Sequence, residues 1–150
     1  MKSASSSHIR MDYSELHGFT FEDLKLGMSA TMSRTITKAD LLDFSHISGD
    51  NNPVHLNEQF AQKTPFGKCI AHGMLSASLI SAVIGTKLPG PGCIYMNQTL
   101  RFLAPVYVGD IVIAVCKIKE LFPEKKRVLL DTKCYVKSMV VIDGDALIKL

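Results

Sequence analysis

The chain has 150 residues, of which 47% are hydrophobic and 21% charged, and its net charge at pH 7 is only +3. This length suits one domain with a proper core, and the composition is typical of a globular protein rather than a disordered one. We expect no nucleic-acid partner, because the small charge provides no broad basic face, and no membrane span, because every apolar run is too short for one.

Residues 1–15 are predicted to be a flexible segment that precedes one domain at 16–150. The first eleven residues are serine-rich and lack acids, a composition faintly similar to that of a transit peptide. The four cysteines form no C-x-x-C pair, and we interpret them as reduced thiols. We therefore expect a cytoplasmic protein, with a mitochondrial location as the alternative if the serine-rich start belongs to a transit sequence.

Three elements are predicted in the first half of the chain. Residues 28–37 are rich in threonine and predict a strand, and a helix is predicted over 38–47. Thr37 and Asp40 have the spacing of a capping box at the start of that helix. Asn57 can cap a second, short helix.

Residues 48–57, SGDNNPVHLN, place a carboxylate and an imidazole five positions apart, at Asp50 and His55. Pro53 has no backbone N–H and restricts Asn52 to extended geometry. The sequence therefore predicts a bent, non-helical loop that carries both side chains.

The stretch GMLSASLISAVIGTKL, which begins at Gly73, is apolar on every side of a helix, with serine as its only polar residue type before Thr86. A helix of this kind is buried inside a protein, and this one is far too short to cross a bilayer. We expect the rest of the chain to wrap around it.

Four segments predict strands separated by short turns: 94–103, 110–120, 127–136 and 139–149. Apolar and polar residues alternate in 127–136, which indicates a sheet with one dry face and one wet face. Asp143-Gly144 resembles a hairpin turn, but we favour a bulge at Gly144 within one last strand. The predicted class is α+β, an antiparallel sheet wrapped around a long central helix.

Ten positions fit the hydratase-2 motif: Phe44, Ile47, Ser48, Gly49, Asp50, Asn52, Pro53, Val54, His55 and Ala61. The stretches AHGM at 71–74 and LPGPGCIYMNQTLRFLAPVYVGD at 88–110 add to the likeness. On these residues the chain, over about 25–150, resembles the MaoC-like (R)-specific enoyl-CoA hydratases, which have the hot-dog fold.

The resemblance implies reversible syn hydration of a trans-2-enoyl thioester to the (R)-3-hydroxyacyl thioester. It implies Asp50 and His55 as the catalytic pair, the Gly73 backbone N–H as donor to the thioester carbonyl, and Ser81 as a support for the histidine. Asn52 and His72 are expected beside the substrate. The resemblance also implies a homodimer, and the carrier of the acyl group is either CoA or acyl carrier protein.

These residue types suit the reaction. A desolvated carboxylate can take a proton from water, and an imidazole can hold the same water and shuttle a proton near neutral pH. No metal or organic cofactor is required, and although His72 has a tempting spacing to Cys69, no second ligand pair suggests zinc. Two alternatives are a hot-dog acyl thioesterase and a non-catalytic acyl-thioester binding module, because a fold alone does not decide function.

Overall fold

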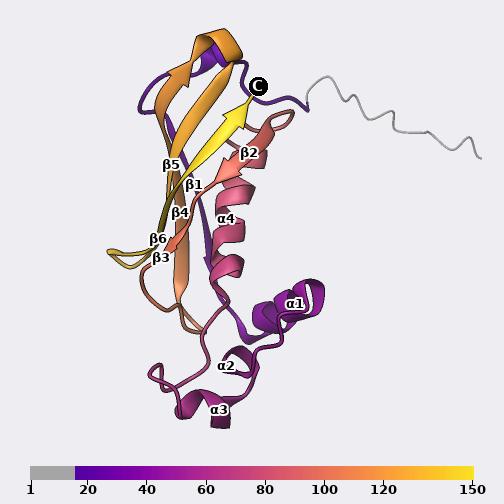
Figure 1. Ribbon diagram of the computed structural model, residues 1–150, viewed down its shortest axis with the longest axis vertical. Helices are drawn as coiled ribbons and strands as arrows, with labels where there is room; N and C mark the ends of the chain where they lie inside the picture. Colours follow the sequence, from indigo (N-terminus) through magenta and orange to yellow (C-terminus); the bar gives the residue numbers. More distant parts are fainter. Residues whose placement is uncertain (1–15) are drawn as a thin grey trace, which may run out of the picture.

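A computed structural model describes residues 16–150, so the predicted flexible segment 1–15 lies outside the described residues. The chain forms one antiparallel sheet and a long helix, α4 (Gly73–Thr86), that lies along it (Figure 1). Three shorter helices, α1 (Lys38–Ser48), α2 (Pro53–Leu56) and α3 (Glu58–Gln62), gather near the N-terminal end of α4. The α+β prediction is confirmed.

The sheet has the strand order β1-β4-β5-β6-β2, and β3 also pairs with β6. Its strands are β1 (Ser29–Thr35), β2 (Ile94–Gln98), β3 (Arg101–Phe102), β4 (Ile111–Phe122), β5 (Arg127–Val136) and β6 (Met139–Lys149). The predicted strand over 94–103 is thus divided in two, whereas the other predicted strands are each continuous. Short 3-10 turns occupy Phe21–Asp23 and Pro123–Lys125, the latter between β4 and β5.

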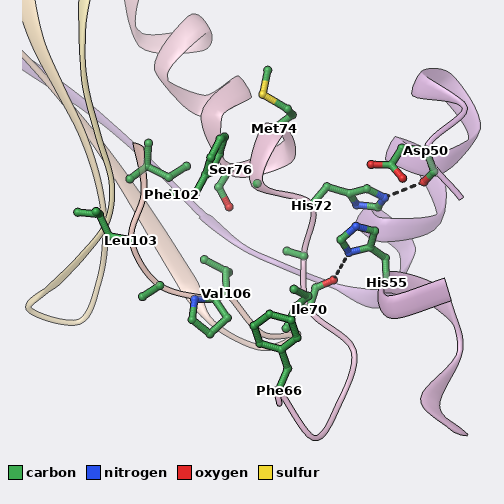
Figure 2. A pocket seen from close by; sticks show the side chains of 15 residues that line it. Asp50, His55, Phe66, Ile70, His72, Met74, Ser76, Phe102, Leu103 and Val106 are labelled. Carbon is green, nitrogen blue, oxygen red and sulfur yellow. Dashed lines mark hydrogen bonds between the residues drawn. The ribbon is translucent and has the colours of Figure 1, made fainter. Parts of the chain in front are cut away.

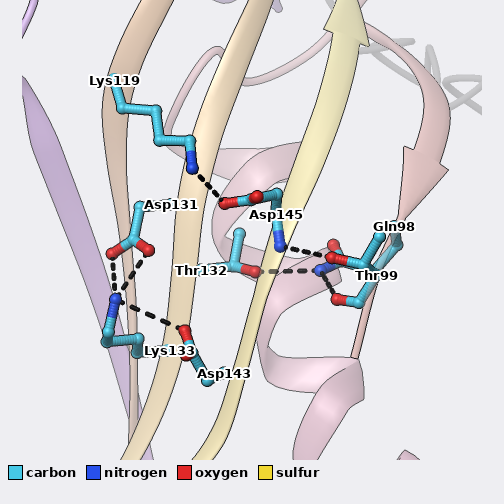
Figure 3. Close-up of polar contacts among 8 residues, drawn as sticks. All are labelled: Gln98, Thr99, Lys119, Asp131, Thr132, Lys133, Asp143 and Asp145. Atoms are coloured by element: carbon cyan, nitrogen blue, oxygen red, sulfur yellow. Dashed lines mark hydrogen bonds and ion pairs between the residues drawn. The ribbon is translucent and has the colours of Figure 1, made fainter. Parts of the chain in front are cut away.

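The two faces of the sheet differ as the alternation in β5 predicts. Every second residue of β5 is buried, and these side chains, such as Leu130, belong to the same core as Ile80 and Ile84 of α4. The opposite face carries ion pairs across β4, β5 and β6 (Figure 3). There Lys133 lies 2.6 Å from Asp131 and 3.4 Å from Asp143. Burial on one face and solvated charge on the other therefore orient the sheet over α4.

Strand β6 is continuous, as predicted, but its bulge is not at Gly144. Gly144 pairs with Thr132 in regular register. The register shifts nearer the start of β6, where Val141 is an extra residue between two pairs, Cys134–Ile142 and Tyr135–Val140. Glycine is required at position 144 because the Thr99 backbone approaches it closely: a Cβ at Gly144 would lie 1.8 Å from the Thr99 carbonyl oxygen. The chain between β2 and β3 runs alongside β6 at this point, and the Thr99 N–H donates to the Asp145 carbonyl.

Helix α4 is not buried on all sides within one chain, which corrects the expectation of a fully wrapped helix. Residues such as Ile80, Val83 and Ile84 are buried against the sheet. A stripe along the other side of the helix is exposed: Met74, Ser78, Ser81 and Gly85. Among residues 16–150, no helix is both long and apolar enough to cross a membrane.

Candidate active site

Helix α1 precedes the site in the chain, and side-chain contacts stabilise its first turn. The predicted capping box is present, with the Asp40 N–H donating to Thr37 Oγ1 at 3.1 Å and the Thr37 N–H donating to Asp40 Oδ2 at 2.9 Å. The Arg34 guanidinium also binds the Asp40 carboxylate, at 2.6 Å. The hydrogen bond from Arg34 is the main cause that lowers the pKa of Asp40 to about 2.

The segment after α1 is partly helical, so the prediction of a non-helical loop is wrong. Pro53 is the first residue of α2, and the Asn52 side-chain oxygen accepts the Val54 N–H at 3.1 Å as the cap of that helix. Proline suits this position because its missing N–H has no partner in the first helical turn anyway. The short helix carries His55, while Asp50 precedes it on the turn that follows α1.

His55 is oriented by a backbone carbonyl. Its Nδ1 lies 2.7 Å from the Ile70 carbonyl oxygen. A carbonyl only accepts, so Nδ1 carries the hydrogen, and in the neutral ring Nε2 keeps its lone pair. Ile70 is itself held, because its N–H donates to the Val54 carbonyl at 3.3 Å and it forms a bridge with Tyr107.

His72 is almost fully enclosed, with 2% of its surface exposed. Its Nε2 lies 3.0 Å from the backbone carbonyl oxygen of Asp50 and 3.0 Å from Ser45 Oγ. The ring stacks on His55, with centroids 3.8 Å apart. Burial lowers the pKa of His72, and the neighbouring His55 adds to the effect. His72 is therefore neutral near pH 7 and donates from Nε2 to the Asp50 carbonyl.

The side chains of the predicted catalytic pair, Asp50 and His55, lie close together. A carboxylate oxygen of Asp50 and ring nitrogens of His55 and His72 all lie within 4.8 Å of one another. One water molecule can bridge polar atoms at that separation. All three residues line a cavity of about 460 Å³ whose other side chains are mostly apolar (Figure 2), including Phe66, Phe102, Leu103, Val106 and Ile142.

Gly73 also lines this cavity, at the first position of α4. The first N–H groups of a helix have no partner within it and form its positive end. Within residues 16–150, the first α4 amides that have a backbone acceptor are those of Leu75 and Ser76, which donate to the His72 carbonyl. A Cβ at Gly73 would lie 2.5 Å from the Phe102 ring, so a side chain at this position would require the exposed ring of Phe102 to move.

Two predicted residues are not brought into the cavity. Asn52 is the cap of α2, where its side-chain oxygen accepts the Val54 N–H, and it does not line the cavity. Ser81 is exposed more than two turns along α4 from Gly73, and it neither lines the cavity nor contacts His55 in this chain. Within one chain Ile70 orients His55, and the role of Ser81 in supporting the histidine stays a prediction.

Besides the apolar lining, three residues that contribute polar groups to the site were not predicted. Ser45 contacts His72, the Ile70 carbonyl orients His55, and Ser76 lies in the cavity wall. For Ile70 no sequence signal exists, because every residue has a carbonyl group. Ser76 does have one, as a polar residue in an otherwise apolar helix.

A curved antiparallel sheet with one long helix along it, and an Asp-His pair at the N-terminal end of that helix, define a hot-dog protein with a polar reaction site. A family model described as "MaoC like domain" matches residues 24–143. The chain belongs to the MaoC-like family, and the resemblance seen in its sequence is confirmed.

Individual relatives agree with this assignment. The "(R)-specific enoyl-CoA hydratase" of Rhodospirillum rubrum is 54% identical over 126 residues, which are 84% of this chain and 88% of the relative. The "3-hydroxybutyryl-CoA dehydratase" of Methylorubrum extorquens is 50% identical over 136 residues, 91% of this chain and 87% of the relative. The solved (R)-hydratase from A. caviae involved in PHA biosynthesis superposes with a TM-score of 0.84 at 38% identity, covering 86% of this chain and 98% of that chain.

Proposed function

We propose that this protein is an (R)-specific enoyl-CoA hydratase, a hydro-lyase that reversibly adds water to trans-2-enoyl-CoA to give (R)-3-hydroxyacyl-CoA. Its main support is the convergence of the Asp50 carboxylate and the His55 ring beside the N-terminus of α4, in a mostly apolar cavity. Relatives at 54% and 50% identity, named as a hydratase and a dehydratase of CoA thioesters, support the same reaction.

In the proposed reaction, one water molecule lies between the Asp50 carboxylate and His55 Nε2. The pair takes a proton from this water while its oxygen bonds to carbon 3 of the substrate. The pair then returns the proton to carbon 2 from the same side, so one water supplies both added groups and the addition is syn. Each well-placed acid–base group is typically worth about 10²–10⁴ in rate.

Negative charge develops on the thioester oxygen between these two events. We propose that the Gly73 N–H donates a hydrogen bond to this oxygen, because the positive end of α4 lies at the same position. His72 is proposed to hold the arrangement together as a neutral residue. It binds the Asp50 carbonyl and stacks on His55, and it immediately precedes Gly73 in the chain.

The activity is tested with crotonyl-CoA, whose conjugated double bond absorbs light and is lost on hydration. We expect wild-type protein to remove the absorbance without releasing thiol, and Asp50→Asn or His55→Gln to lose about 10²–10⁴ in turnover while melting normally. Asp43→Asn is the matched control, because Asp43 is exposed on α1 away from the cavity. Release of free CoA would indicate a thioesterase, and binding without turnover would indicate a binding module.

We propose that two copies form a homodimer. The edge strand β2 exposes Ile94, Tyr95 and Met96, of which Ile94 is 56% exposed, and an unpaired apolar edge is a template for another strand. The exposed stripe of α4 includes Met74, also 56% exposed. Light scattering coupled to size-exclusion chromatography tests this, and Met96→Lys should raise the monomer fraction.

We also propose a reducing compartment such as the cytoplasm. All four cysteines are free thiols, and burial raises the pKa of Cys116 and of Cys134 to about 12, so these two thiols are unreactive. Fluorescence microscopy of the tagged full-length protein distinguishes this location from a mitochondrial one.

A further inference from the structure

Ser76 lies in the first turn of α4 and is 1% exposed. Within residues 16–150 its Oγ has no hydrogen-bond partner, which is unusual for a buried hydroxyl. The residue lines the same cavity as Asp50 and His55. Figure 2 shows its hydroxyl pointing from α4 into the cavity, beside Phe102 and on the side away from Asp50.

The helix places this hydroxyl next to the proposed oxyanion donor. Ser76 follows Gly73 by three positions, so the two residues share one face of α4. Side chains in a helix lean toward its N-terminus, and the Ser76 side chain therefore leans over the turn that begins with Gly73. Because Gly73 has no side chain, it places no atoms of its own between this buried hydroxyl and the start of the helix.

The surroundings also restrict what the hydroxyl can do. A serine nucleophile needs a base within hydrogen-bond distance, and no such partner exists among the described residues. The hydroxyl is thus a neutral donor without an acceptor, in the wall of the cavity. A buried donor without an acceptor costs free energy. A substrate oxygen that accepts a hydrogen bond from Ser76 would remove this cost.

Resting on the proposed hydratase function, we propose that Ser76 is a second oxyanion donor. Its hydroxyl donates a hydrogen bond to the thioester carbonyl oxygen alongside the Gly73 N–H and keeps its proton throughout. The bond strengthens as negative charge grows on this oxygen, so it stabilises the transition state more than the bound substrate.

The test compares Ser76→Ala and Ser76→Cys with Thr86→Ala in the full-length protein. Cysteine keeps the size of the side chain but is a weak donor. Thr86 is the matched control, because it is exposed on the same helix and its hydroxyl donates to the Ala82 carbonyl outside the cavity. For each protein, kcat and KM are measured with crotonyl-CoA and with trans-2-octenoyl-CoA, together with thermal melting.

We expect both Ser76 variants to lose about 10²–10³ in kcat with both substrates, the typical effect of removing one such donor. The melting temperature of Ser76→Ala should be unchanged or higher, because no bond within the protein is lost. Thr86→Ala should keep wild-type kinetics. This combination separates a catalytic hydroxyl from a structural one, whose removal would lower the melting temperature.

Three results would overturn the proposal: unchanged kcat in the Ser76 variants, a loss confined to one chain length, or a clear drop in melting temperature with Ser76→Ala. The second result would assign Ser76 to the acyl chain instead. Wild-type protein that hydrates neither substrate would refute the proposed function itself, whereas active wild type with an unaffected Ser76→Ala refutes only this inference.

Discussion

The sheet with α4 and the segment from Gly49 to His72 are held together in different ways. In the sheet, alternate residues are buried in a continuous apolar core that includes α4. The segment from Gly49 to His72 has few buried side chains, and its parts are tied by single hydrogen bonds, such as those from His55 to Ile70 and from His72 to Asp50. Burial stabilises the sheet and α4, which together we call the frame. Directed polar contacts in the segment from Gly49 to His72 orient the reacting groups.

This contrast predicts that damage to the frame changes stability, and we expect the largest change in β5. Leu130 is fully buried, and Leu130→Ala should lower the free energy of unfolding by about 2–5 kcal/mol. Leu129→Ala is the matched control, because Leu129 is only half-buried, on the opposite face of the same strand. Urea unfolding measures both, and equal losses for the two variants would contradict the two-faced sheet.

Substitutions in the segment from Gly49 to His72 should instead change activity. We expect His72→Ala to lower kcat/KM for crotonyl-CoA by about 10²-fold, because small misplacements of reacting groups have effects of that size. His72→Gln should recover part of the loss, since its amide can still donate to the Asp50 carbonyl. Steady-state kinetics and melting curves test this, and equal activity in the two variants would argue against a positioning role.

We expect a smaller effect from a substitution in the capping box of α1. Asp40→Asn removes the ion pair with Arg34 and weakens the cap, and it should lower the free energy of unfolding by about 1–2 kcal/mol at pH 7. The pKa of Asp40 is about 2, below its ordinary value of 3.8. Its contribution is therefore complete above pH 4 and is lost as the pH falls toward 2.

Unfolding at several pH values checks this expectation. The difference between wild type and Asp40→Asn should shrink between pH 4 and pH 2. Asp43→Asn, on the exposed side of the same helix, should show no such convergence. A difference that stays constant down to pH 2 would mean that the carboxylate charge does not stabilise α1.

The frame could be predicted from the sequence because burial leaves a periodic pattern. The alternation in residues 127–136 and the apolar stretch after Gly73 correspond to β5 and α4, and the spacing of Thr37 and Asp40 matches the observed capping box. What the pattern missed depends on tertiary contact. The Thr99 carbonyl that excludes a side chain at Gly144 comes from a distant segment, and nothing local marks it.

The site was only partly predictable, for a related reason. The motif identified Asp50 and His55, but Pro53 was interpreted as a helix breaker although it begins α2. The contacts that aim the pair use backbone carbonyls of Ile70 and Asp50, which no residue type reveals. The exposed stripe of α4 was missed because serine and glycine in an apolar helix do not show which side faces the sheet.

The smallest effect is expected on the outer face of the sheet. Lys133 lies between the carboxylates of Asp131 and Asp143 (Figure 3), yet this face is partly open to water, which screens the attraction. Lys133→Met should therefore change the free energy of unfolding by less than about 1 kcal/mol, and added salt should reduce the difference. Lys117→Met, at an exposed position that has no ion pair among residues 16–150, is the control for urea unfolding at low and high salt. A loss similar to that of Leu130→Ala would mean that the charged face stabilises the frame as much as the core does, and burial alone would no longer explain the sheet.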